Sequence, residues 1–227
     1  MNASSSNRDA CFVDRADAAR QLAKVLGHYR GLQPLVLAIP RGGLPIGRIV
    51  ANALDGELDV VLVRKLCSPI NSEVAIGAID EQGRVQLNAL AGVLDAENRH
   101  IRAEAARQLA VIRKRRAACT PGRQTVDAHG RLMIVVDDGL ATGATMRAAL
   151  EAVRQQHPAR LVAAVPVAAP GSLDDLAGLA DEVTCLHAPA HFRAIRAFYQ
   201  DFGPVDDREV LELLSAPTVA VKSPVNP

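Results

Sequence analysis

Two adjacent aspartates, Asp137 and Asp138, stand between a short apolar run and a loop of small residues in RLMIVVDDGLATGATMRAAL, residues 131–150. Like charges at the end of a buried strand repel each other, so the pair is costly unless a ligand or a cation compensates it. One aspartate could cap the following helix while the other is solvated. That alternative leaves the loop behind them unexplained.

The loop after the aspartates has the composition of an anion site. It combines glycines that permit close backbone approach, alanines with little bulk, and hydroxyls: Gly139, Ala141, Thr142, Gly143, Ala144 and Thr145. It opens a helix, whose first N–H groups lack intrahelical partners and carry the positive end of the helix dipole. If the loop binds a phosphate and the carboxylates bind a vicinal diol, the predicted ligand is a sugar phosphate. The loop lacks the GxxxxGK[ST] and GxGxxG patterns of nucleotide-binding loops.

Two basic segments could neutralise a further anionic group. AIPRGGLPIG, residues 38–47, places Arg41 before Gly42 and Gly43 at the end of a strand. VRKLCSPINSE places Arg64 and Lys65 at the end of the next apolar run. Taken alone, the first favours a surface arginine at a strand-to-helix turn, and the second is equally compatible with ordinary charges at a strand end.

The elements that must position these residues alternate along the chain. Apolar runs predict strands at about 34–39, 58–65, 132–136, 160–167 and 182–187. Amphipathic segments predict helices between them, and residues 73–88 predict a hairpin turning at Gly83. Strands separated by helices favour an α/β fold, a parallel twisted sheet flanked by helices. Ligands of such sheets bind beyond the carboxyl ends of the strands, where Asp137 and Asp138 fall.

Composition excludes several classes of function. The 227 residues carry 26 basic and 25 acidic side chains, a net charge of +1, which gives no global attraction to nucleic acid or membranes. The basic helix 99–116 is the one local patch, and we interpret it as a solvated helix face. The four dispersed cysteines and the polar N-terminus predict a reduced, cytoplasmic protein without a membrane span.

Three segments resemble one family. VVDDGLATGATM resembles the phosphoribosyl pyrophosphate motif of the type I phosphoribosyltransferases. IPRGG resembles the pyrophosphate loop of these enzymes, which often holds a non-proline cis peptide, and VRK resembles the start of their mobile catalytic loop. The resemblance covers roughly residues 34–190. The three segments together are most similar to a subgroup of predicted phosphoribosyltransferases whose acceptor is unassigned.

The resemblance implies a role for each candidate residue. Asp137 and Asp138 would bind the ribose hydroxyls, and residues 141–145 the 5′-phosphate. Arg41 with its two glycines, Arg64 and Lys65 would face the departing pyrophosphate. Mg²⁺ would be bound mainly through phosphoribosyl pyrophosphate and water, with no dedicated protein site. The expected product comes from attack by a nitrogen heterocycle, and we expect a homodimer. A non-catalytic sensor of phosphoribosyl pyrophosphate that binds nucleic acid or a protein partner is the alternative.

The resemblance also divides the chain into parts. We expect a disordered segment 1–11, one domain over 12–215 with a lid at about 66–118 and a hood at about 188–215, and a flexible tail 216–227. Ala141 stands where oxopurine-using members carry an acid, and residues 160–172 lack their lysine, so we expect no oxopurine acceptor. The aromatic residues of 187–202 either pack against the last helix, form a dimer contact, or stack on a planar acceptor. Phe198 and Tyr199 are the first candidates for stacking.

Overall fold

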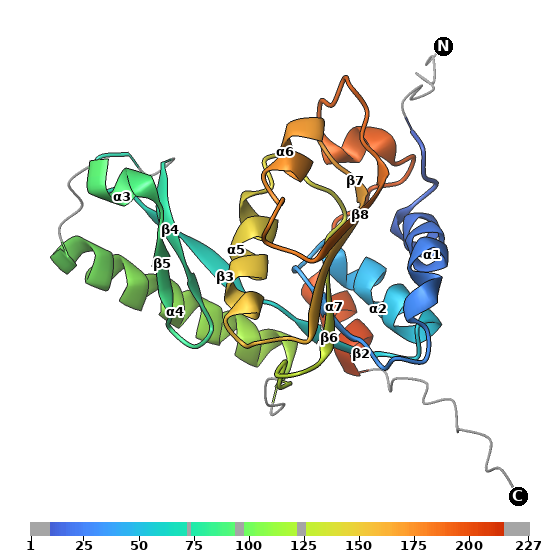
Figure 1. The fold of residues 1–227 in the computed structure, drawn as a ribbon, viewed down its shortest axis with the longest axis horizontal. Helices are drawn as coiled ribbons and strands as arrows, with labels where there is room; N and C mark the ends of the chain where they lie inside the picture. The colour runs from blue at the N-terminus through green and yellow to red at the C-terminus, as the bar shows by residue number, and fades with distance from the viewer. Residues whose placement is uncertain (1–9, 72–73, 94–97, 122–125, 216–227) are drawn as a thin grey trace, which may run out of the picture.

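A five-stranded parallel sheet forms the centre of the molecule, a computed structural model that describes residues 10–71, 74–93, 98–121 and 126–215 (Figure 1). The strand order is β2–β1–β6–β7–β8. The bounds are β1 Leu35–Ala38, β2 Glu57–Val60, β6 Leu132–Val136, β7 Arg160–Val167 and β8 Glu182–His187. Each neighbouring pair is parallel, as helical crossovers require. The predicted fold class is confirmed.

The sheet separates two apolar cores, because side chains alternate along each strand. On β6, Ile134 and Val136 point to one face and Met133 and Val135 to the other, all fully buried. Continuous apolar strands of this kind occur where both faces of a parallel sheet are covered. β6 therefore lies in the middle of the protein, and its buried strand positions the two aspartates that follow its carboxyl end.

Helices cover both faces of the sheet. α1 and α2 pack together on one face, and α5 lies on the other (Figure 1). α1 begins after Asp14, whose side chain accepts a hydrogen bond of 2.7 Å from the Asp17 N–H. The bounds are α1 Arg15–Val25, η1 Leu26–Tyr29, α2 Gly43–Ala53, α5 Ala144–Arg154, α6 Pro170–Asp174, η2 Ile195–Phe198 and α7 Asp207–Ser215.

The predicted strand 58–65 is wrong, because it is two strands in two sheets. β2 ends at Val60, and β3, Val63–Cys67, pairs antiparallel with β4, Ala75–Asp80, which pairs with β5, Val85–Leu87. The hairpin turn at Gly83 is present. α3, Ala89–Val93, and α4, Asn98–Cys119, follow. We call the described residues of 63–119 the arm, which projects from the sheet in Figure 1.

A largely buried guanidinium joins the arm to the sheet. Arg116 on α4 donates to Asp59 Oδ1 on β2 at 2.7 Å and to Glu81 Oε1 in the hairpin turn at 2.6 Å. It also donates to the Val60 carbonyl at 3.0 Å. Asp59 is completely buried and Arg116 retains 14% of its side-chain exposure. The most basic helix thus uses one of its cations inside the protein.

The two ends of the described chain differ from the expected parts in one respect. Residues 1–9 and 216–227 lie outside the described residues, so the predicted disorder of these segments stays a prediction. The Cys11 N–H, in contrast, donates to the Phe198 carbonyl at 3.0 Å, and Phe12 pairs with Tyr199. None of the helices in the described residues combines the length and the apolar character needed to cross a bilayer.

Candidate active site at the carboxyl end of the sheet

Hydrogen bonds hold the two aspartates at the end of β6. The Asp138 N–H donates to Asp137 Oδ1 at 2.9 Å. The Tyr199 hydroxyl donates to the Asp138 carbonyl at 2.7 Å. Asp138 is 8% exposed, and Asp137 is partly exposed. Both carboxylates therefore lie at the edge where a ligand of this sheet would bind, and that of Asp137 is the more accessible.

Burial makes both aspartates weaker acids than an exposed aspartate. Burial raises the pKa of Asp137 well above its ordinary value, and the neighbouring Asp138 charge raises it further. Burial also raises the pKa of Asp138, although the Arg15 guanidinium opposes this shift. The pair consequently favours any partner that brings positive charge or hydrogen-bond donors to it.

The loop that the sequence predicts to bind phosphate, which we call the phosphate loop, follows the aspartates directly. Gly143 has a φ of 70° and stands at the N-cap of α5, a left-handed position that suits glycine. Around it, four predicted phosphate-binding residues are exposed: Ala141, Thr142, Ala144 and Thr145. The Ser172 hydroxyl donates to the Ala141 carbonyl at 2.6 Å and anchors the loop to α6. Gly139 is different, since it is buried against Ile195 of the hood.

The loop at residues 40–43 covers the carboxylates. Its Pro40–Arg41 peptide is cis, as the resemblance implied. A Cβ atom added at Gly42 would lie 2.0 Å from Asp138 Oδ2, and one at Gly43 would lie 2.7 Å from the Val136 carbonyl oxygen. Both glycines are thus required for the loop to approach the aspartates. Arg41 itself contacts the hood, with Nη2 2.9 Å from Asp207 Oδ1.

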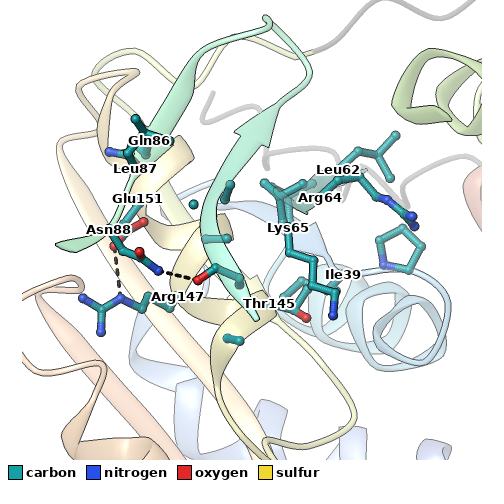
Figure 2. A pocket seen from close by; sticks show the side chains of 18 of the residues that line it. Ile39, Leu62, Arg64, Lys65, Gln86, Leu87, Asn88, Thr145, Arg147 and Glu151 are labelled. Carbon is teal, nitrogen blue, oxygen red and sulfur yellow. Dashed lines mark hydrogen bonds and ion pairs between the residues drawn. The ribbon is translucent and has the colours of Figure 1, made fainter. Parts of the chain in front are cut away.

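Arg64 and Lys65 lie on opposite faces of β3. Arg64 Nε donates to Gln108 Oε1 of α4 at 2.9 Å. Lys65 is exposed, and its side chain lines the same cavity as Thr145 (Figure 2). The structure therefore brings Lys65 to the phosphate loop, whereas the Arg64 guanidinium is engaged with α4.

Arg15 is a site residue that the sequence did not reveal. Its Nε lies 2.9 Å from Asp138 Oδ2, and its Nη1 donates to the Gly203 carbonyl at 2.7 Å. The guanidinium also stacks over Phe202, 3.8 Å from the ring centroid. Nothing in its local sequence distinguishes Arg15 from Arg20 of the same helix. The contact joins residues 123 positions apart.

The hood aromatics pack the interior. Phe198 and Tyr199 are only 3% and 2% exposed, so the hypothesis that they stack on an acceptor is wrong. The ring of Tyr199 lies 5.3 Å from that of Phe12 and 5.0 Å from that of Phe202. Packing, one of the other interpretations of this stretch, is the observed role.

A cavity of about 510 Å³ lies beside the phosphate loop, between the arm and α5 (Figure 2). Its lining includes Pro40, Lys65 and Thr145, three of the residues described above. Neither Asp137 nor Asp138 is among the lining residues. The cavity thus adjoins the site of the carboxylates and extends away from it.

Comparison with known proteins places this arrangement in a family. The model of the phosphoribosyl transferase domain matches residues 14–202, so the chain belongs to that family. Its fold is that of the type I phosphoribosyltransferases.

Individual relatives are similar over most of the chain. A Mycobacterium tuberculosis protein, known from strains CDC 1551 and H37Rv and provisionally named a phosphoribosyl transferase, is 41% identical over 211 residues. That match covers 89% of this chain and 46% of the relative, so the chain spans about half the length of this protein. The crystal structure of TT1426 from Thermus thermophilus is 45% identical, with a TM-score of 0.82 over 89% of this chain and 97% of TT1426.

Proposed function

We propose that the chain transfers ribose 5-phosphate from phosphoribosyl pyrophosphate to a nitrogen acceptor and releases pyrophosphate. The observation that carries this proposal is the convergence of two adjacent carboxylates, a predicted phosphate loop and the 40–43 loop at one edge of the sheet. A ligand that meets all three needs a diol, a monophosphate and a second anionic group. Membership of the phosphoribosyl transferase family supports this donor.

Each group would have a distinct part in the reaction. The exposed loop 141–145 and the N-terminus of α5 would bind the 5′-phosphate. Asp137 and Asp138 would accept hydrogen bonds from the ribose hydroxyls and stabilise the positive charge that develops on the sugar ring. Lys65 and the backbone around Arg41 would neutralise the leaving pyrophosphate. No covalent nucleophile is needed, because positioning and electrostatics suffice for a dissociative displacement.

Mg²⁺ fits this site as a companion of the donor. Hard carboxylate and phosphate oxygens are its preferred ligands, and it keeps several waters. No group of three or more His, Cys, Asp or Glu side chains in the described part of the chain is arranged to hold a metal. We therefore propose that Mg²⁺ is carried by the pyrophosphate and water. When bound, it would neutralise charge on the leaving group.

Calorimetry tests the proposal for the donor. Phosphoribosyl pyrophosphate should bind only with divalent metal, and Asp137→Asn/Asp138→Asn should reduce its affinity at least tenfold. The matched control is Asp174→Asn/Asp175→Asn, an adjacent pair at the end of α6 that lies outside the proposed site. Unchanged affinity in the first double variant would remove the diol-binding role.

A sensor that binds the donor without turning it over is the second candidate. The specific observation in its favour is that the Arg64 guanidinium is bound to Gln108 and Arg15 already pairs with Asp138. A pure sensor needs the phosphate cradle without a full clamp for the leaving group. A screen of nucleobases and related amines for pyrophosphate release, with Mg²⁺ present, separates the two candidates. Donor binding without release across the panel would favour the sensor.

A further inference from the structure

The cavity between the arm and α5 has two facing walls. One wall is a single face of the arm sheet, because Lys65, Ala78 and Gln86 are cross-strand neighbours on β3, β4 and β5. The other wall is α5, with Ala144 and Ala148. The volume of the cavity, about 510 Å³, falls within the range of small-molecule sites, about 300–1,000 Å³. The cavity is therefore large enough for a ligand of its own.

The walls favour a flat, apolar ligand body. Ala78 faces the cavity from the sheet and Ala148 from the helix, so small side chains stand on both sides. Val61 and Val63 add apolar surface. A hydrated pyrophosphate gains no binding free energy from apolar surface. A planar ring, in contrast, contacts both walls and removes its own apolar surface from water. The proposed donor alone does not account for this lining.

The rim of the cavity favours an anion. Among the described residues that line it, Arg64, Lys65, Arg115 and Arg147 are basic, and Glu151 is the acidic one. Glu151 is already paired, with Oε1 3.2 Å from Arg147 Nε, as the dashed line in Figure 2 marks. Lys65 and Thr145 line the cavity together, so an ammonium group and a hydroxyl donor are available to an anionic group there.

We propose that this cavity binds a small planar aromatic anion, with its ring between Ala78 and Ala148 and its anionic group near Lys65 and Thr145. The site of the ring is separate from the proposed ribose site, because neither aspartate lines the cavity. The proposal does not require that the protein be a transferase. It requires only that ring and anion bind together.

1-Naphthyl phosphate is the probe, since it has a ring and a phosphate but no ribose diol for the aspartates. We expect calorimetry without phosphoribosyl pyrophosphate to give a dissociation constant at least tenfold lower than those of 1-naphthol and inorganic phosphate. Octyl phosphate, which carries the same anion on a flexible chain, should bind at least threefold more weakly than the probe. A probe affinity equal to that of inorganic phosphate would overturn the proposal. Equal affinity for octyl phosphate would overturn the claim that the cavity prefers a planar ring.

Larger side chains in the space between Ala78 and Ala148, which we call the slot, test where the ring binds. Ala148→Trp should weaken 1-naphthyl phosphate at least tenfold while inorganic phosphate binds as before, and Ala78→Leu provides the same test from the opposite wall if the first variant does not fold. Arg147→Gln should weaken the probe at least twofold. Its matched control is Arg208→Gln, which breaks the same kind of i, i+4 pair, Arg208 with Glu212 at 2.9 Å, on α7. Unchanged probe affinity in the folded slot variants would refute the site.

Retained binding of phosphoribosyl pyrophosphate in these slot variants would separate the two sites. If the donor fails to bind the wild type while the probe binds, the proposed function fails and this proposal stands. If the donor binds and the probe does not, the reverse holds.

Discussion

Arg15→Met should destabilise the protein in a way that depends on pH. The substitution keeps the apolar stem and removes the guanidinium from Asp138, whose side chain is 11% exposed. Removing one partner of a buried ion pair costs about 3–5 kcal/mol, and the lost contact with the Phe202 ring adds to this. Because both side chains keep about a tenth of their exposure, we expect the lower end, about 3 kcal/mol at pH 8. For a protein of this size the melting temperature would fall by roughly 6–12 °C.

The pH dependence follows from the direction of the pKa shift. Burial raises the pKa of Asp138 above 3.8 and Arg15 opposes this, so the variant should have a still higher pKa. A raised pKa means that the folded state binds the proton more tightly than the unfolded state, and stability falls as pH rises through that window. The loss caused by Arg15→Met should be smallest near pH 4 and full at pH 8. The charged groups facing Asp138 in the structure are Arg15 and Asp137.

Thermal denaturation of a double-mutant cycle measures this effect. In an Asp138→Asn background, Arg15→Met should cost only about 1 kcal/mol, the packing part, which leaves a coupling of about 2 kcal/mol. Arg30→Met is the control, because Arg30 pairs with Asp55 at 3.2 Å with 65% of its side chain exposed, and such pairs contribute about 0–1 kcal/mol. Equal losses in both backgrounds, at pH 5 and at pH 8, would refute a role for charge.

Three further predictions concern the site. Lys65→Ala should slow turnover with any accepted substrate more than tenfold while changing donor affinity less than threefold, because a charge on the leaving group matters most in the transition state; unaltered turnover would remove Lys65 from catalysis. Asp137→Asn should raise the melting temperature of the free protein at pH 8 by about 2–4 °C, since it removes a desolvated charge but keeps the oxygen that accepts the Asp138 N–H, and it should also weaken donor binding. A lower melting temperature would contradict that reasoning. Hypoxanthine, guanine and xanthine should give no pyrophosphate release, because Ala141 replaces the acid and residues 160–172 contain no lysine to bind the exocyclic oxygen of a 6-oxo base. Rapid turnover of guanine in the same screen would show this argument to be mistaken.

The parts of the site that the sequence predicted are local in the chain. β6 and the loop after it follow from an apolar run, two acids and the spacing of small residues, which lie within about a dozen positions. The close approach of Gly42 and Gly43 likewise depends on glycines that stand next to each other. Such features can be predicted from a local sequence pattern because they depend mainly on residues that are neighbours in the chain.

The features that the sequence missed are set by tertiary contacts. Val61 and Leu62 are apolar and carry no turn signal, so the break between β2 and β3 is invisible until the second sheet forms. Arg15 meets Asp138 across 123 positions. The separation of Arg64 from Lys65, in contrast, was open to prediction, because successive residues of a strand face opposite sides.

The joint at Arg116 makes the arm inseparable from the rest of the protein, although Figure 1 draws it as a projecting lobe. Replacing Arg116 alone with an uncharged residue would remove the guanidinium and leave Asp59, which is fully buried, without its countercharge. Such an orphaned charge costs about 3–5 kcal/mol, a large share of the stability of a typical domain. Lobe and sheet should therefore melt as one cooperative unit, and amide protons on β4 should exchange with solvent as slowly as those on β2.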